Sequence, residues 1–287
     1  MCVLNICGGK GGVRGKGAAK GKNPFPPDIM EDYKNMRCYY REKKYICGDY
    51  MDVMVFPVFA KSKVRRSRAK PTSEAQEKIN AENSKRKLTR LIHCNFTKND
   101  NAVHLTYGSG NEPKDADQAR KDAQSFIRKL KRRYEKLGID LKYIWVCETG
   151  ERSERIHHHL IISGGISRDA IEELWQFGYA NVKRLQFGEN GIVGLSVYMT
   201  KQKLLFKRWS ASRNLTQPRV LTDDYKYSQK DVRDIIQSGD FYIFLQNYEG
   251  CGLTDYEAVE NKLFGGGFIR AAFYDAERVK VFKRGGD

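Results

Sequence analysis

The chain of 287 residues contains no apolar run near the roughly 18 residues that a membrane-spanning helix needs, so we expect no integral membrane protein. The N-terminus has no basic segment before its apolar start and no A-x-A site, which argues against a secretory signal. None of the seven cysteines belongs to a C-x-x-C pair. This spacing disfavours a zinc site and favours reduced thiols in a cytosol.

A nucleotide-binding loop is also missing. The glycine-rich segment 8–22 departs from the pattern G-x-x-x-x-G-K-[ST], because Lys10 stands where the first glycine belongs and Lys16 is followed by Gly17. No other loop of this kind occurs in the sequence, which excludes an ATP-driven helicase or motor and leaves no nucleotide cofactor to expect. With seven glycines and five basic residues, segment 8–22 is predicted to be a flexible basic arm.

Positive charge is abundant. The 52 Lys and Arg residues outweigh 35 Asp and Glu, which gives a net charge of +17. Hydrophobic residues make up 40% and aromatic residues 11%, enough for a real core and too many for a wholly disordered chain. A folded protein with this charge favours a polyanionic partner, most commonly nucleic acid. Composition alone does not separate DNA from RNA, or an enzyme from a coat protein.

The middle of the chain has the clearest pattern of elements. Its order of strand, helix, strand, strand, helix, strand is that of a ferredoxin-like antiparallel sheet with helices on one face, so we predict an α+β fold. A further helix after Gly191 would carry Tyr198. The predicted strands and helices of this unit cover residues 102–107, 113–137, 141–148, 155–163, 167–175 and 179–187.

The flanking regions are less regular, and we divide the chain into three parts. Residues 1–71 are predicted to be a basic arm and an irregular segment with short strands, residues 72–220 a nuclease domain, and residues 221–287 a C-terminal extension packed on the core. A helix is expected over 73–96, at the start of the second part. In the third part we expect a helix at 229–237, a strand at 241–248 and a capped helix at 252–264.

The run from Ile156 to Ile162 carries the strongest indication of chemistry. In a strand, His157 and His159 point to one face and His158 to the other. The predicted hairpin brings Glu148 close to the pair, and two imidazoles with one carboxylate would complete a three-ligand metal site. A chance histidine cluster or a surface patch is the alternative.

Tyr198 and Lys201 stand one turn apart on one face of the helix expected after Gly191. With 16 tyrosines in the chain, a packed or surface role is the default for any one of them. The order of the motifs changes that expectation. A Leu-Thr-Tyr strand, a basic helix, the Glu and His-x-His hairpin and a Tyr-x-x-Lys helix follow one another along the sequence.

This order resembles the HUH endonuclease superfamily, and within it the rolling-circle replication initiators of phages and plasmids. Thr106 and Tyr107 match the end of the first motif, His157 and His159 the second, and Tyr198 the third. The segment 206–218 also resembles the stretch after the third motif in initiators of phage type. Some relatives carry a second tyrosine four residues after the first, where this chain has Gln202, so a single nucleophile is favoured.

The resemblance implies a site-specific endonuclease that nicks and rejoins single-stranded DNA at a replication origin. Tyr198 would form a 5′-phosphotyrosyl bond and free a 3′-OH primer, with Lys201 steadying the developing charge. Mg²⁺ or Mn²⁺ would be held by the histidine pair and Glu148. A host helicase and polymerase are the expected partners, in the cytoplasm of a bacterial host cell. The same catalytic core serves transposases and relaxases, which remain an alternative.

Several residues are expected to contact DNA. Arg152 and Arg155 flank the histidine hairpin, and Thr106, Tyr107 and Lys203 belong to the neighbouring motifs. The nine basic residues of helix 113–137 form either a solvated face or a surface that follows phosphates. A non-catalytic nucleic-acid-binding module on a ferredoxin-like sheet is the alternative of a different class. An RNA-recognition module would show RNP-type aromatic motifs, and the sequence has none.

Overall fold

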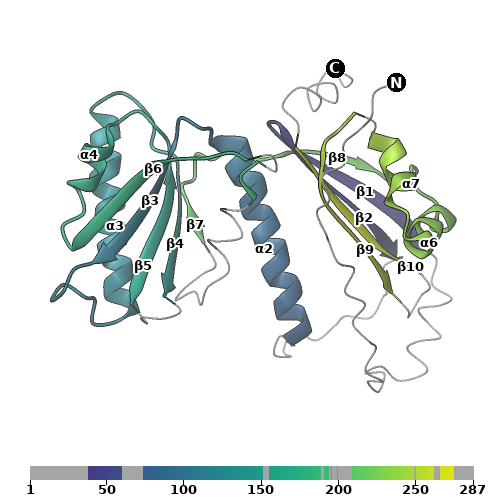
Figure 1. The fold of residues 1–287 in the computed structure, drawn as a ribbon, viewed down its shortest axis with the longest axis horizontal. Helices are drawn as coiled ribbons and strands as arrows, with labels where there is room; N and C mark the ends of the chain where they lie inside the picture. Colours follow the sequence, from purple (N-terminus) through teal and green to yellow (C-terminus); the bar gives the residue numbers. More distant parts are fainter. Residues whose placement is uncertain are drawn as a thin grey trace, which may run out of the picture.

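The computed structural model describes residues 38–59, 74–150, 155–188, 191–193, 195, 199, 209–248, 250–261 and 266–274. Within these ranges the strands form two five-stranded antiparallel sheets. Figure 1 shows helix α2 (Glu74–Asn95) between the two sheets, with α3 and α4 on the far side of one sheet and α6 and α7 on the far side of the other. None of the described helices has the length and apolarity that a bilayer span requires.

The first sheet, here called the central sheet, has the strand order β6-β3-β5-β4-β7. Its first four strands and two helices follow the predicted order along the chain, and their spatial order is that of a ferredoxin-like fold, so the α+β prediction is confirmed. The elements are β3 (Asn101–Tyr107), α3 (Ala116–Glu135), β4 (Tyr143–Thr149), β5 (Ile156–Ile162), α4 (Arg168–Glu172), β6 (Gly178–Arg184) and β7 (Ser210–Ala211).

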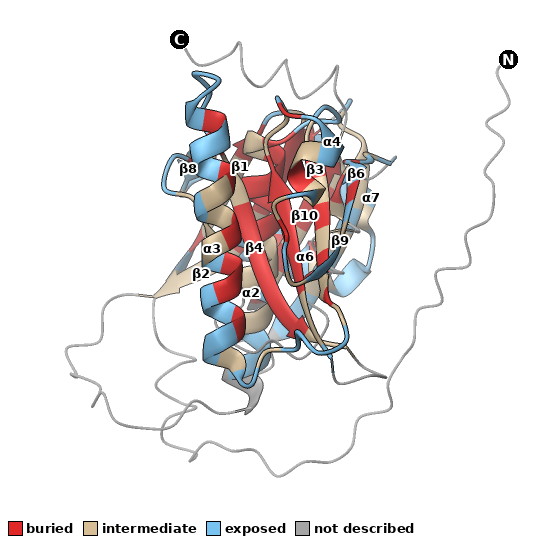
Figure 2. Cartoon of the chain, turned by 90° about the vertical axis from the view of Figure 1, so that its left-hand side faces the viewer, coloured by how far each residue is buried: buried red, intermediate tan, exposed pale blue. Residues whose placement is uncertain are grey.

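Both faces of the central sheet are covered in part. Alternate β3 residues such as Leu105 pack against α3, whose Phe126 and Leu130 belong to one apolar stripe. The opposite face receives the last turns of α2, where Ile92 packs beside Ile161 of β5. In Figure 2, β4 is buried along nearly its whole length, as expected for a strand that has packing partners on both faces.

The second sheet, here called the outer sheet, has the strand order β8-β1-β2-β10-β9 and combines distant parts of the chain. Helices α6 and α7 pack on one face, with Phe244 and Tyr248 against Met51 and Phe273. The elements are β1 (Cys38–Cys47), β2 (Tyr50–Phe59), β8 (Arg219–Asp223), α6 (Gln229–Ser238), α7 (Phe241–Leu245), the 3-10 helix η1 (Gln246–Tyr248), β9 (Leu253–Asn261) and β10 (Gly266–Tyr274).

Three expectations for these flanking regions differ from the structure. Segment 38–59 is a regular hairpin of two ten-residue strands, because Gly48 (φ 61°) makes the turn and β10 completes the pairing of β2. Segment 241–248 is helical: Asp240 caps it, and Phe244 and Tyr248 are buried one turn apart. The expected helix at 252–264 is strand β9, paired with the apolar strand β10 over Leu253–Asn261.

Helix α2 ties the two sheets together. Arg90 donates to Asp52 of β2 at 2.6 Å, and its guanidinium lies 3.4 Å from the centroid of the Tyr45 ring. One turn later His93 stacks on Tyr50, with ring centroids 4.4 Å apart. Residues of parts 1–71 and 221–287 thus share one sheet, while the division of the chain into three domains stays a prediction.

Candidate active site

The strand register of the central sheet gathers the predicted metal ligands in two adjacent rows. Thr106 of β3 stands opposite His157 of β5, and His157 stands opposite Glu148 of β4. The next row on the same face pairs His104 with His159. Because directly opposed residues of adjacent strands share a face, all five side chains lie on the side of the sheet that faces α2.

Glu148 and His159 form the closest contact of the cluster. His159 Nε2 lies 2.7 Å from Glu148 Oε1, and both side chains are buried. Since a carboxylate only accepts, the ring donates its Nε2 proton. The hairpin therefore brings Glu148 to the histidine pair, as the sequence indicated.

His104 is a member of the cluster that sequence reasoning missed. Its ring stacks on His159, with centroids 4.5 Å apart and planes 6° apart, and lies 5.3 Å from the ring of His157. A signal was present, because His104 precedes Thr106 by two residues on the same strand and so shares its face. Only the register between β3 and β5 shows which histidine it meets.

Burial keeps several of these imidazoles neutral. Loss of hydration, with smaller contributions from the neighbouring histidines, lowers the pKa of His104 to about 4. The pKa of His157 is lowered by the same causes, burial first. A neutral imidazole has a free ring lone pair, so the rings of His104 and His157 are in the protonation state that metal binding needs.

His158 points to the other face of the sheet, as predicted, into a buried hydrogen-bond network. Trp145 Nε1 donates to its Nδ1 at 3.3 Å, so its Nε2 carries the proton and donates to the Tyr107 hydroxyl at 3.0 Å. The hydroxyl in turn donates to Asp122 at 3.2 Å. Burial lowers the pKa of His158 to about 3, which keeps it neutral. This network places the Tyr107 side chain in the core, whereas Thr106 lies on the face of His157.

Two cavities adjoin the histidine cluster. The larger, about 580 Å³, lies at the ends of β3, β5 and β6, and its lining includes Thr106, Arg155, His157 and Tyr179. The smaller, about 220 Å³, has a lining made from the sheet and from the segment that follows Gly191. Its lining residues include His104, His159, Asn181, Lys183, Leu195 and Met199.

The predicted tyrosine segment reaches this second cavity at two described positions. Leu195 and Met199 line it beside His159, and Ile192 packs with them in the core under α2. Tyr198 precedes Met199 in the sequence but lies outside the described residues. The same holds for four other residues discussed in the sequence analysis: Arg152, Lys201, Gln202 and Lys203.

The candidate ligands His157, His159 and Glu148 are of types that bind a divalent ion, although their side chains are not arranged around a common metal position. No group of three or more His, Cys, Asp or Glu within the described ranges is arranged to hold a metal ion. The potential ligands Glu148 and His159 hydrogen-bond each other. His157 Nδ1 is buried and has no hydrogen-bond partner. Imidazole and carboxylate groups are ligands that Mn²⁺ or Mg²⁺ accepts.

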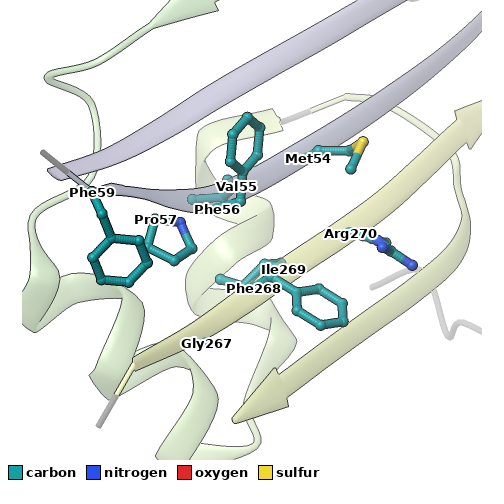
Figure 3. Close-up of a pocket in the computed structure, with 9 residues that line it drawn as sticks. All are labelled: Met54, Val55, Phe56, Pro57, Phe59, Gly267, Phe268, Ile269 and Arg270. Carbon is teal, nitrogen blue, oxygen red and sulfur yellow. The ribbon is translucent and has the colours of Figure 1, made fainter. Parts of the chain in front are cut away.

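A third cavity, of about 310 Å³, lies in the outer sheet, and Figure 3 shows the residues that line it. Phe56 and Phe59 of β2 and Phe268 of β10 supply aromatic rings, and among the described residues that line the cavity only Arg270 is ionisable. Without an acid, a base or a nucleophile in its lining, this cavity is not a candidate for the catalytic centre.

Residues 100–203 match the family model of the replication-associated protein ORF2. No curated protein and no solved structure matches the chain significantly. The matched region begins at β3, contains the histidine cluster and extends past Tyr198. This similarity indicates a replication-associated role with an interaction with DNA, and is consistent with a replication initiator.

Proposed function

We propose that the protein initiates rolling-circle replication as a site-specific single-strand DNA endonuclease of the HUH type. The observation that carries the proposal is the row of Glu148, His157 and Thr106 on one face of a ferredoxin-like sheet, with His159 in the next row. Met199, which follows Tyr198 in the chain, lines a cavity together with His159. The family match over 100–203 supports the same function.

Tyr198 is the proposed nucleophile. Its phenolic oxygen attacks the scissile phosphorus, the bond to the 3′ oxygen breaks, and the phenolic proton leaves through solvent while the released oxygen is protonated to a 3′-OH. A phenol with an ordinary pKa of about 10 is a weak nucleophile at neutral pH. A divalent ion held by His157, His159 and Glu148 would polarise the phosphate. Since phenolate is a good leaving group, the 5′-phosphotyrosyl bond stays reversible, and strand joining uses the same intermediate.

The neighbouring side chains orient the cluster and balance charge. Without a metal, Glu148 holds the ring of His159 through their hydrogen bond, and His104 supports the face of that ring by stacking. Arg155 is exposed beside His157 and can contact the DNA backbone near the cut. In this proposal Lys201 steadies the negative charge that develops on the phosphate or the phenolate. The chain has no ATP-binding loop, so a host helicase and polymerase complete replication.

The test is formation of a covalent adduct. The full chain is incubated with labelled single-stranded DNA from its own replicating element, with Mn²⁺ or with EDTA, beside Tyr198→Phe and a control, Tyr225→Phe. Tyr225 is 97% exposed and follows β8 of the outer sheet. We expect a metal-dependent, SDS-stable adduct that only Tyr198→Phe abolishes.

Other outcomes contradict parts of the proposal. An adduct that persists in Tyr198→Phe assigns the nucleophile to another tyrosine. Tight metal-independent binding without cleavage or adduct refutes the enzyme and identifies a non-catalytic binding module.

A further inference from the structure

Three exposed side chains run along β6, the edge strand of the central sheet. Tyr179, Asn181 and Lys183 alternate with residues that face α3, and they share the face of the histidine cluster. Tyr179 is 77% exposed, which is unusual for a large aromatic side chain in a strand. Among the described residues, the Asn181 amide has no hydrogen-bond partner and the Lys183 ammonium has no ion-pair partner.

These three side chains are here called the β6 stripe. The strand register aligns the stripe with the two rows of the central sheet that contain the histidine cluster. Tyr179 stands opposite Thr106, in the row that continues through His157 to Glu148. Asn181 stands opposite His104, in the row that continues to His159. The stripe is thus two strands away from the histidine pair and parallel to it.

The cavities join the stripe to the cluster. Tyr179 and His157 line the cavity of about 580 Å³, and Asn181 and Lys183 line the one of about 220 Å³ together with His159. A ligand lying along β6 would therefore enter both cavities and meet His157 in the larger one and His159 in the smaller one.

The side chains of the stripe match the chemistry of a single strand of nucleic acid. Bases stack on an exposed aromatic ring, an amide reads a base edge, and an ammonium pairs with a phosphate. Side chains at i and i+2 of a strand lie about 6.6 Å apart, a spacing that lets successive nucleotides of an extended strand each meet one of them. Duplex DNA would not offer a free base face to Tyr179, because its bases are stacked on one another.

Protection of the sheet edge against pairing with other chains explains only some of the side chains of the stripe. Exposed lysines are common on edge strands, where they prevent pairing with other chains. That account covers Lys183 but not Tyr179, because an exposed aromatic ring favours association rather than preventing it. The net charge of +17 also agrees with a polyanionic occupant.

We propose that β6 holds the single-stranded DNA beside the cluster, with Tyr179 stacking on a base next to the scissile phosphate and Lys183 contacting a backbone phosphate. Asn181 reads the edge of a base between them. This inference rests on the proposed function for the position of the cut, whereas the binding itself needs no cleavage.

The experiment measures binding without chemistry. Fluorescence anisotropy of a labelled, mixed-sequence single-stranded oligonucleotide is followed with the full chain in EDTA. We compare Tyr179→Ala and Lys183→Ala with the matched surface controls Tyr225→Ala and Lys230→Ala, which lie outside the central sheet. Loss of one stacking contact should weaken binding about tenfold in Tyr179→Ala. Lys183→Ala should lower the slope of log affinity against log salt by about 0.7, the value for one phosphate contact on a single strand.

A second readout separates stacking from a structural role. The fluorescence of 2-aminopurine, placed at successive positions of the oligonucleotide, should be quenched by the wild type at one position and recover in Tyr179→Ala. Tyr179→Phe, which keeps the ring, should retain both quenching and affinity. Equal affinities of Tyr179→Ala and Tyr225→Ala, or equal competition by duplex DNA, would overturn the proposal.

The two proposals fail in different ways. Binding that depends on Tyr179, together with no covalent adduct in Mn²⁺, refutes nicking and leaves the β6 site intact. An adduct that forms while binding is indifferent to both β6 substitutions refutes the β6 site alone.

Discussion

The ring of His104 lies flat against the ring of His159, with centroids 4.5 Å apart and planes inclined by 6°. At its ring edge, His159 is held by Glu148 at 2.7 Å. One proposed ligand is therefore fixed from two directions by residues of the two flanking strands, β3 and β4. In known metal sites, removing such a supporting contact commonly lowers metal affinity by roughly 10- to 100-fold.

We therefore expect His104→Ala to weaken Mn²⁺ binding about tenfold, because the His159 ring loses its stacking partner. His104→Phe keeps a flat ring and should restore most of the affinity. Isothermal titration calorimetry with Mn²⁺ measures the affinity of both variants. If His104→Phe binds as weakly as His104→Ala, His104 acts through its nitrogen as a ligand rather than through stacking.

Glu148→Gln should abolish the metal-dependent adduct while leaving the fold intact, since the amide still accepts a hydrogen bond from His159 but supplies no charge to a cation. Glu257→Gln, on the half-exposed carboxylate that pairs with Arg270 in the outer sheet, is the matched control. Adduct yield is read on SDS gels in Mn²⁺. Wild-type yield from Glu148→Gln would remove Glu148 from the proposed ligand set.

Tyr107→Phe should destabilise the protein by about 1–3 kcal/mol, because the buried His158 Nε2–H then lacks its acceptor and Asp122 loses a donor. Urea unfolding followed by Trp fluorescence measures the change. The control Tyr225→Phe should stay within about 0.5 kcal/mol of the wild type. An unchanged stability for Tyr107→Phe would mean that His158 does not depend on this hydroxyl.

Stability should fall as the pH is lowered from about 6.5 to about 4. Burial lowers the pKa of His93 to about 4 from an ordinary 6.5, so in this window the unfolded chain binds a proton that the folded chain excludes. The shift corresponds to roughly 3 kcal/mol, fully lost once the pH reaches the folded pKa. His104 and His158 act with the same sign.

His93→Phe isolates the contribution of one residue, because phenylalanine can keep the stacking on Tyr50 and binds no proton. Urea unfolding at pH 7 and at pH 4.5 should show a smaller loss of stability in this variant than in the wild type. A loss as large as that of the wild type would assign the acid sensitivity to the other buried histidines.

Asp52→Ala should destabilise the protein by about 3–5 kcal/mol, because the buried guanidinium of Arg90 is left without its counter-charge. The pair links α2 to β2, so the outer sheet should be affected most. Hydrogen exchange of β1 and β2 amides locates the effect, and Glu257→Ala is a control at a partly exposed pair. A loss below about 1 kcal/mol would mean that solvent and neighbouring groups compensate for Asp52.

The sequence predicts local features of the fold better than long-range ones. The β4–β5 hairpin followed from two runs rich in strand-forming residues with a polar turn between them, and α3 from its apolar stripe and the following Gly138. The contact between Glu148 and the histidine pair could be predicted because a hairpin sets its own register. The place of His104 required the β3–β5 register, which joins strands far apart in the sequence.

The outer sheet could not be derived in the same way. Val53 of β2 pairs with Ala271 of β10, and no local sequence pattern predicts this long-range pairing. The charged sequence of β9 has the composition of a helix. It forms a strand because it pairs with β10. In segment 241–248 the aromatic residues favour a strand by propensity, but the cap at Asp240 and the burial of Phe244 and Tyr248 select a helix.

The pairing of Val53 with Ala271 has a consequence for synthesis of the chain. All strands of the central sheet are complete before β8 is translated, so that sheet can fold while the ribosome is still working. The β1–β2 hairpin emerges first but gains its neighbour β10 last, and until then Met51, Val53 and Val55 have no finished core to enter. A nascent chain that stalls before β10 would combine a folded central sheet, with its histidine cluster, and a β1–β2 hairpin whose apolar side chains are still exposed. Chaperones bind exposed apolar surfaces of this kind.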